Sequence, residues 1–342
     1  MKNWTISFLI MALALAGYGK AIRVLPELVF PSFLETDGQN IFIMDQVQVY
    51  VYSLEDYKLA GQFGKQGEGP GELMTQPDLP ATMLVHGDHV ILNSFNKMVT
   101  YTKSGEFVAE KKIPFILSQM IPFGKYYAVS KFNRLADGGS KVSVLLLDET
   151  LETVKEVYET SLLNDQGRGR VAYPLLTVYI RVADDKLYVY NQQEGFKIRL
   201  YDPAGEPVGE IEHAYEKIKT GADYKKTKME WLLKQPAAKQ VPEEILKKWV
   251  YFLDELPVLI HFLIKDKKIY AQTSRARNSE SESEFFVLDL SGKVLGKRFL
   301  PNAKPESIRI NPAANYTFDQ DRYLYLRETE DDEWELCVEV LK

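Results

Sequence analysis

The feature that most constrains this fold is a pattern of short strands and tight turns that repeats along the chain. Its clearest copy begins at the turn Asp37-Gly38 and continues as a strand ending in Asp45. An alternating strand over residues 47–52 and a third strand over residues 59–63 follow. An Asp-Gly pair beside alternating apolar residues is a strong hairpin signal. Weaker copies follow in the same order, and their equivalent strands contain Val90, Tyr127, Leu187, Ile269 and Leu324.

The spacing of most copies is near the length of a propeller blade, which is about 40 to 50 residues. A blade has four strands, whereas the copies show three. A short apolar segment precedes several copies, at residues 83–86, 177–182 and 258–264. We expect these segments to form the innermost strands, along the central channel. The sequence therefore predicts an all-β fold, a single six-bladed β-propeller over residues 22–342.

The longest interval separates the fourth and fifth copies, and residues 215–253 there lose the strand-like alternation. Residues 222–234 form one candidate helix. Pro242 suits the first position of a second helix, with two glutamates in its first turn. We predict a helical insertion between blades four and five whose apolar face docks on the propeller. Residues 217–248 hold nine lysines against four acidic residues, so the alternative is an element that caps the channel mouth or contacts an anionic partner. The apolar residues at helical spacing are Ile245, Leu246, Trp249, Phe252 and Leu253.

The two ends of the sequence indicate how the propeller ring closes and whether the protein is exported. The last copy shows only about two strands between residues 322 and 340, so we expect a strand over residues 22–30 to complete that blade. Before it, Lys2 and the apolar run 6–16 are typical of a signal peptide, which we place at residues 1–21. Two small-residue cleavage sites end at Ala16 and Ala21. An uncleaved N-terminal anchor is the alternative.

Composition limits the partners. The net charge is −6, and the signal segment takes Lys2 and Lys20 with it, so the mature chain is more acidic still. An acidic chain without a basic tail is a poor nucleic-acid binder. No other apolar run is long enough to span a bilayer. The single cysteine, Cys337, forms no internal disulfide, and its place in an alternating strand predicts a packed core residue.

The unit from Asp37 to Leu73 resembles an NHL-type repeat, in which a strand ending in Asp and an alternating strand lead to a glycine-rich exit. Here that exit is residues 63–73, with the sequence FGKQGEGPGEL. The other copies lack it. The resemblance implies a six-bladed propeller similar to secreted bacterial proteins of this type. The glycine run itself has neither the spacing nor the following helix of a nucleotide loop, so we expect a tight corner between blades.

Candidate site residues are few. Arg170 precedes a predicted innermost strand and Arg181 lies within one, so both are candidates to meet a carboxylate or phosphate at the channel opening. An ordinary solvated arginine is the alternative for each. His86 and His261 also fall in predicted innermost strands, which leaves open a metal site assembled from separate blades. No local spacing indicates a catalytic residue, a metal site or a cofactor.

The sequence thus favours a periplasmic or extracellular propeller that acts as a ligand-binding or protein-interaction scaffold, without enzymatic activity. Its partner, an unidentified protein or small ligand, is not a nucleic acid, and no membrane span remains after signal cleavage. The alternative is a metal-dependent propeller hydrolase or lyase with its active site at the channel mouth. A sensor module of a larger assembly is a third reading. Fold class alone does not decide among these functions.

Overall fold

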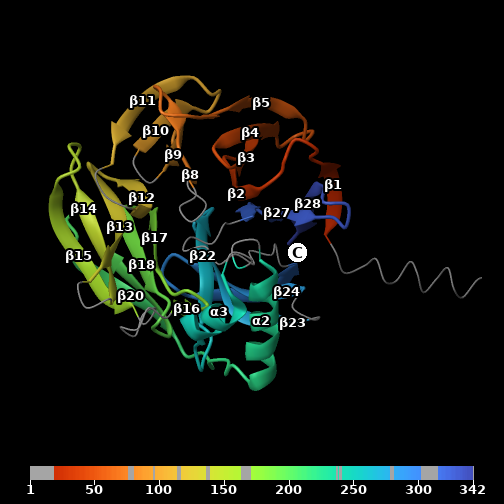
Figure 1. Cartoon of the computed structure of the whole chain (residues 1–342). Helices are drawn as coiled ribbons and strands as arrows, with labels where there is room; N and C mark the ends of the chain where they lie inside the picture. The colour runs from red at the N-terminus through yellow and green to blue at the C-terminus, as the bar shows by residue number, and fades with distance from the viewer. Residues whose placement is uncertain are drawn as a thin grey trace, which may run out of the picture.

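Six four-stranded antiparallel sheets are arranged around a ring in a computed structural model of the chain (Figure 1). The protein is therefore a six-bladed β-propeller, as the sequence predicts. The structure describes residues 19–75, 81–94, 97–113, 117–135, 139–162, 171–235, 238, 241–277, 281–301 and 315–341.

In the first three blades the strands run in chain order from the channel outward. Blade 1 contains β2 (Pro31–Thr36), β3 (Asn40–Asp45), β4 (Gln48–Ser53) and β5 (Leu59–Phe63). Blade 2 contains β8 (Thr82–His86), β9 (His89–Asn93), β10 (Lys97–Thr102) and β11 (Phe107–Lys112). Blade 3 contains β12 (Leu117–Phe123), β13 (Tyr126–Arg134), β14 (Ser140–Leu147) and β15 (Thr153–Leu162).

Blades 4 and 5 repeat this order, and blade 6 takes its outermost strand from the other end of the chain. Blade 4 contains β17 (Val178–Ala183), β18 (Lys186–Asn191), β19 (Phe196–Tyr201) and β20 (Pro207–His213). Blade 5 contains β22 (Leu259–Lys265), β23 (Lys268–Arg277), β24 (Glu282–Asp289) and β25 (Val294–Pro301). Blade 6 contains β26 (Tyr316–Asp319), β27 (Arg322–Glu328), β28 (Trp334–Val340) and β1 (Lys20–Val24).

The N-terminal segment closes the ring, but over a shorter stretch than residues 22–30. Strand β1 pairs antiparallel with β28 from Lys20 to Val24 (Figure 1). Pro26 follows, and proline cannot donate a ladder hydrogen bond. The next residues cross to the channel, where Pro31 begins the innermost strand of blade 1. One N-terminal segment therefore supplies the outer strand of the last blade and the inner strand of the first.

The three predicted innermost strands correspond to β8, β17 and β22, each within one residue of its expected limits. Those of blades 1, 3 and 6 were not predicted. Strand β26 has only four residues and β12 contains Pro122, so neither shows a clear alternation. The blade interfaces are strongly apolar; the largest side chains that are fully buried include Tyr52, Tyr188, Tyr190, Tyr270 and Phe262. Cys337 is also fully buried, as expected of a core residue.

One turn recurs between the third and fourth strands of blades 2 to 6, and blade 1 has a version one residue longer. In blade 4 the Asp202 carboxylate accepts hydrogen bonds from the backbone N–H groups of Ala204 and Glu206, both at 2.9 Å. Asp148 and Asp289 make the same bonds in blades 3 and 5. Gly205 takes the left-handed position of the turn, with φ of +74°. These turns join the outer hairpin of each blade, on the side of the ring facing away from the insertion.

The glycine-rich exit forms a corner between blades 1 and 2. Two short strands, β6 (Lys65–Gln66) and β7 (Glu72–Leu73), pair in parallel across it. The Glu72 carboxylate accepts hydrogen bonds from the Lys65 ammonium at 2.6 Å and from the Gly69 N–H at 3.0 Å. These bonds fix the loop internally, which agrees with a structural corner.

The insertion lies between blades 4 and 5 and contains two helices (Figure 1). Helix α2 is Ala222–Lys234, as predicted, and α3 is Glu243–Trp249 with Pro242 as its N-cap, one position earlier than expected. The prediction that the helical face continues through Phe252 and Leu253 was wrong, because α3 ends at Trp249. Residues Val250–Phe252 form β21, which pairs in parallel with β16 (Val171–Tyr173). Three residues of high strand propensity and an available partner strand outweigh the helical spacing.

The expected docking of the apolar face of α3 on the propeller was also wrong. None of the α3 residues is buried, and Ile245 and Trp249 are 39% and 48% exposed. Helix α2 buries only Leu232. The insertion is held instead by the pairing of β21 with β16, by the ring of Trp231, 6.4 Å from that of Tyr173, and by the Tyr215 hydroxyl, which donates to Glu284 at 2.6 Å.

Candidate ligand site in the central channel

A cavity of about 170 Å³ lies in the channel, lined by residues from the innermost strands of blades 1 to 5. Strand β8 borders it along its whole length, from Thr82 to His86, so the cavity is elongated along the channel. Its apolar wall consists of Phe33, Met83, Leu84, Val85, Met120, Ile121, Val182, Leu263 and Ile264. Ligand sites usually combine apolar walls with a few polar groups in cavities of about 300 to 1,000 Å³, so a cavity of this size suits only a very small ligand.

Arg181, on β17, is the central polar residue of this cavity. Its Nη1 donates to the Ile180 carbonyl at 2.7 Å, and its Nη2 lies 2.6 Å from Nε2 of His261 on β22. The other ring nitrogen of His261, Nδ1, lies 2.8 Å from the Tyr316 hydroxyl, which donates to Gln272 Oε1 at 3.0 Å. The guanidinium is therefore anchored by a chain of bonds that joins blades 4, 5 and 6.

The direction of these bonds fixes the state of His261. A guanidinium only donates, so Nε2 of His261 accepts and the proton is on Nδ1, which donates to Tyr316. Burial, and next the charge of Arg181, hold the pKa of His261 well below its usual value. The imidazole is neutral at physiological pH and adds no charge to the cavity.

The charges that line the cavity do not cancel. Glu35 on β2 forms an ion pair with Lys265 on β22, with 2.5 Å between Oε2 and Nζ, and Lys265 also donates to the Thr36 carbonyl. Among the described residues, no carboxylate lies within ion-pair distance of Arg181. Burial lowers the pKa of the guanidinium, but its usual value above 12 keeps it charged. Counted over the described residues, the cavity therefore holds one positive charge in excess, because Glu35 is paired with Lys265.

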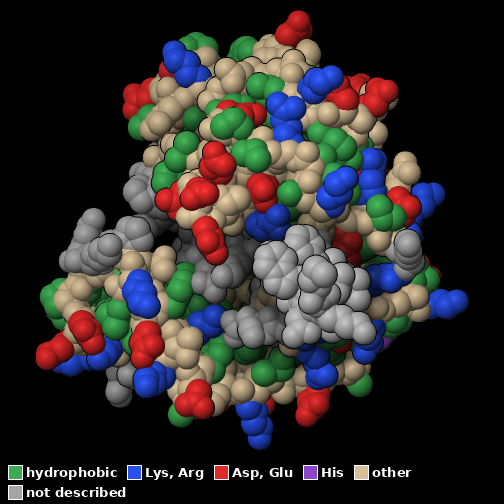
Figure 2. Space-filling model, turned by 90° about the vertical axis from the view of Figure 1, so that its right-hand side faces the viewer, with side chains coloured by type: hydrophobic (Ala, Val, Ile, Leu, Met, Phe, Trp, Pro, Cys, Tyr) green, Lys and Arg blue, Asp and Glu red, His purple; other side chains and the backbone are tan. Residues whose placement is uncertain are grey.

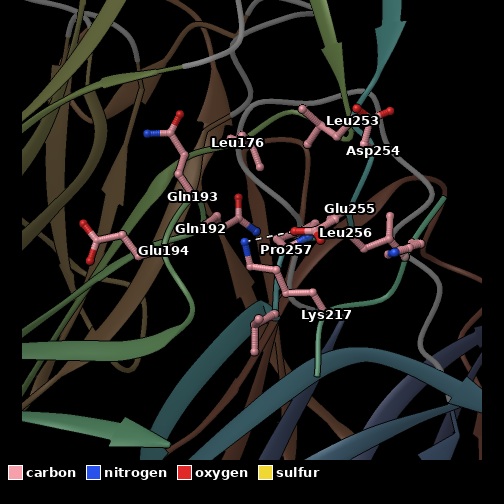
Figure 3. Close-up of a pocket in the computed structure, with 12 residues that line it drawn as sticks. Leu176, Gln192, Gln193, Glu194, Lys217, Leu253, Asp254, Glu255, Leu256 and Pro257 are labelled. Atoms are coloured by element: carbon pink, nitrogen blue, oxygen red, sulfur yellow. Dashed lines mark ion pairs between the residues drawn. The ribbon is translucent and has the colours of Figure 1, made fainter. Parts of the chain in front are cut away.

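A second hollow, of about 480 Å³, lies between blade 4 and the insertion (Figure 3). Residues Gln192 to Glu194 form one side, and Leu253 and Asp254 form the other (Figure 3). Each acidic side chain of this groove is ion-paired: Glu194 with Arg199 at 2.6 Å, Asp254 with Lys225 at 3.1 Å, and Glu255 with Lys217 at 3.1 Å. Its carboxylates are thus neutralised within the protein, unlike the charge of Arg181.

The positive charge of the lysines in the insertion is likewise partly neutralised by ion pairs within the folded protein. Lys217 and Lys225 pair with Glu255 and Asp254, which follow the helices in sequence, and Lys247 pairs with Glu243 at 2.5 Å. On the face of the molecule in Figure 2, acidic and basic side chains are interspersed. That view shows no large area of one charge of the kind that binds nucleic acid.

The structure places one of the two predicted site residues in the cavity. Arg181 lines it, whereas Arg170 lies outside the described residues. His86 and His261 also line it. Within the described ranges, however, no three His, Cys, Asp or Glu side chains are grouped so as to hold a metal ion. The alternative of a metal-dependent hydrolase or lyase gains no residues from this part of the chain.

Sequence reasoning missed Asn93, Glu35 and Lys265, which also line the cavity. A signal for Asn93 was present, because Asp45, Asn93 and Asn191 end equivalent second strands in blades 1, 2 and 4. Glu35 and Lys265 belong to strands far apart in the chain. Their proximity depends on closure of the ring, which cannot be predicted from a local sequence pattern.

Comparisons with known proteins support the fold. A model of the family DUF5128, described as a 6-bladed beta-propeller, matches residues 28–171. The match covers less than half of the chain. It does not test the resemblance to NHL repeats, which stays a prediction. A search of curated proteins finds no match.

Several solved structures are similar over most of the chain at low identity. A DUF4221 family member from Bacteroides vulgatus is 10% identical, with a TM-score of 0.48 over 93% of this chain and 98% of that one. BamB from Moraxella catarrhalis is 11% identical, with a TM-score of 0.38 over 90% and 84%. Hsv2 from Kluyveromyces lactis is 11% identical, with a TM-score of 0.39 over 91% and 98%.

Proposed function

We propose that this protein is an exported, non-enzymatic binding propeller whose central channel holds a small anionic ligand at Arg181. The observation that carries the proposal is the positive charge in the channel cavity, which no carboxylate of the described residues pairs with. Removing an ion from water without a counter-charge is costly. A bound anion would supply that counter-charge, so ligand binding and the stability of the site favour each other.

The geometry suits a carboxylate or a phosphate group. A guanidinium has five N–H groups, and two are used in the bonds to Ile180 and His261. No hydrogen bond of the described residues occupies the others, although the guanidinium also lies over the Phe262 ring at 5.6 Å. Charge-assisted bonds from such groups to an anion are among the strongest in proteins. The anchoring chain through His261 and Tyr316 holds the guanidinium in place before the ligand arrives, which limits the ordering cost of binding.

The first prediction concerns anion binding in solution. We expect acetate or inorganic phosphate to bind one site with a dissociation constant of about 1 mM, a typical value for a ligand of few atoms. Because a hydrogen bond to a charged group contributes about 1.5 to 3 kcal/mol, Arg181→Gln should weaken binding at least about tenfold. Calorimetric titrations with each anion measure both quantities and show which of the two the site prefers.

Arg199→Gln is the matched control, because Arg199 lies in the same blade and pairs with Glu194 away from the channel cavity. It should leave anion binding unchanged. Since Arg181 also holds His261, the fold of each variant is checked by denaturant unfolding. Arg181→Lys, which keeps the charge without the paired N–H groups, should bind at intermediate strength. If neither anion binds the wild-type protein, the proposal is wrong.

Export is the second prediction. Strand β1 begins at Lys20, and Ala21 is paired with Cys337. Cleavage after Ala21 would remove the first two residues of the closing strand, whereas cleavage after Ala16 leaves it whole. We therefore expect an exported mature protein that begins at Gly17, which mass spectrometry of the periplasmic or secreted fraction would detect. A protein that keeps residues 1–16 would instead support an anchor. Among the described residues, no helix is long and apolar enough to cross a membrane.

A further inference from the structure

A second polar residue in the channel cavity narrows the class of ligand. Asn93 lies at the end of β9, is only 6% exposed and lines the same cavity as Arg181. Its side-chain oxygen Oδ1 has no hydrogen-bond partner within the part of the chain that the structure describes. A buried acceptor without a partner costs about 1 to 3 kcal/mol, so such groups are rare and call for an explanation.

The equivalent residues of other blades are satisfied. Asp45, at the end of β3, accepts hydrogen bonds from the N–H groups of Val29 and Phe30, which precede β2. Asn191, at the end of β18, accepts from Gln193 N–H at 3.0 Å. Two positions before β8, where blade 1 has Val29, the sequence has Pro80, and proline has no N–H to donate. Blade 2 thus lacks one of the two backbone donors that blade 1 supplies, while Ala81 stands at the position of the other, Phe30.

The backbone positions of Asn93 and Arg181 lie at different levels along the channel. Thr82 is paired with Asn93 at the start of β8, and Val178 is paired with Asn191 at the equivalent position of β17. Arg181 follows Val178 by three residues, which is about 10 Å along a strand. The elongated cavity contains both levels, so one small molecule can extend from one residue toward the other.

We infer that the ligand is a small carboxylate that carries a hydroxyl group several bonds away. Its carboxylate would pair with Arg181. Its hydroxyl would donate to Asn93 Oδ1, which has almost no accessible surface in this structure and would turn toward the cavity when the ligand binds. The inference rests on the proposed function, because it adds a second contact to the same site. A hydroxyl fits better than an ammonium group, since the cavity already has an excess positive charge. The volume of about 170 Å³ limits the ligand to one small molecule.

The test compares butyrate with 4-hydroxybutyrate, and acetate with glycolate, by calorimetric titration of the full-length mature protein. We expect 4-hydroxybutyrate to bind about tenfold tighter than butyrate, because its hydroxyl satisfies a buried acceptor. Glycolate should gain less over acetate, since its hydroxyl lies next to the carboxylate and does not reach Asn93.

Asn93→Leu provides the decisive variant, because it keeps the side-chain size and removes the acceptor. It should abolish the preference for 4-hydroxybutyrate over butyrate and not lower the stability of the free protein. Asn191→Leu, at the matched position of blade 4, should keep the preference. Equal binding of butyrate and 4-hydroxybutyrate to the wild type would overturn this inference but not the anion site. If neither binds, the anion site itself is wrong.

Discussion

Replacing Gly205 with alanine should lower the free energy of unfolding by about 2 to 5 kcal/mol, measured by chemical denaturation. Two effects add. Gly205 has φ of +74°, where an L-residue costs about 1 to 2 kcal/mol. A Cβ there would also lie 2.5 Å from Val157 Cγ1 on the outermost strand of blade 3, and forcing an extra carbon into a packed contact costs about 1 to 3 kcal/mol.

Two other glycines separate these effects. Gly124 has φ of +58° but only Pro203 near its would-be Cβ, at 3.8 Å, so alanine there tests the backbone cost alone. Gly209, on the same strand that follows the turn, has open space and an ordinary φ. Alanine at position 209 should be neutral or slightly stabilising. If Gly205→Ala costs no more than Gly124→Ala, the contact between blades is not tight.

The turns between the third and fourth strands differ in whether their positive-φ position is a glycine. The corresponding positions of blades 1, 3 and 6 are Tyr57, Leu151 and Asp332, which also have positive φ. Positive φ is therefore tolerated without glycine. Gly105, Gly205 and Gly292 are the positions where a Cβ would come within 2.8 Å of the preceding blade, at Phe63, Val157 and Ile211. Close approach of neighbouring blades, rather than the turn alone, explains glycine at these three sites.

The sequence was most informative where the interactions are local. The turns at Asp202-Pro-Ala-Gly205 and before Gly292 could be predicted because their hydrogen bonds join residues at most four apart. The alternating second and third strands were predicted for the same reason. The strand β26 was missed because four residues carry too little alternation to distinguish it from a loop.

The site depends on longer-range geometry. Arg181 was a candidate only because it lies in a predicted innermost strand. Nothing near it in sequence indicates Glu35, Asn93 or His261, which come from three other blades. Helix α3 shows a different kind of error, in which a contact was predicted that the structure does not have. Its helical spacing correctly predicts a helix, but the spacing does not say which surface, if any, the apolar residues cover.

Removing strand β1 should lower the free energy of unfolding about as much as Gly205→Ala does. We expect a protein that begins at Leu25 to be less stable than one that begins at Gly19 by about 2 to 6 kcal/mol, because four residue pairs of the β1–β28 ladder are lost and each net hydrogen bond contributes about 0.5 to 1.5 kcal/mol. Denaturant unfolding measures the difference.

The reactivity of the single thiol, Cys337, provides an independent measure of the loss of β1. Cys337 lies on β28, is paired with Ala21 and is fully buried. Without β1, the edge of β28 is exposed, so labelling of Cys337 by a thiol reagent should become faster, and the free strand edge should promote self-association in size-exclusion chromatography. The protein that begins at Gly19 is the control for both readouts. Unchanged stability and labelling would show that three strands suffice for blade 6. A large loss would instead establish that the chain ends are joined in one blade, so that the channel and its anchored Arg181 depend on that closure.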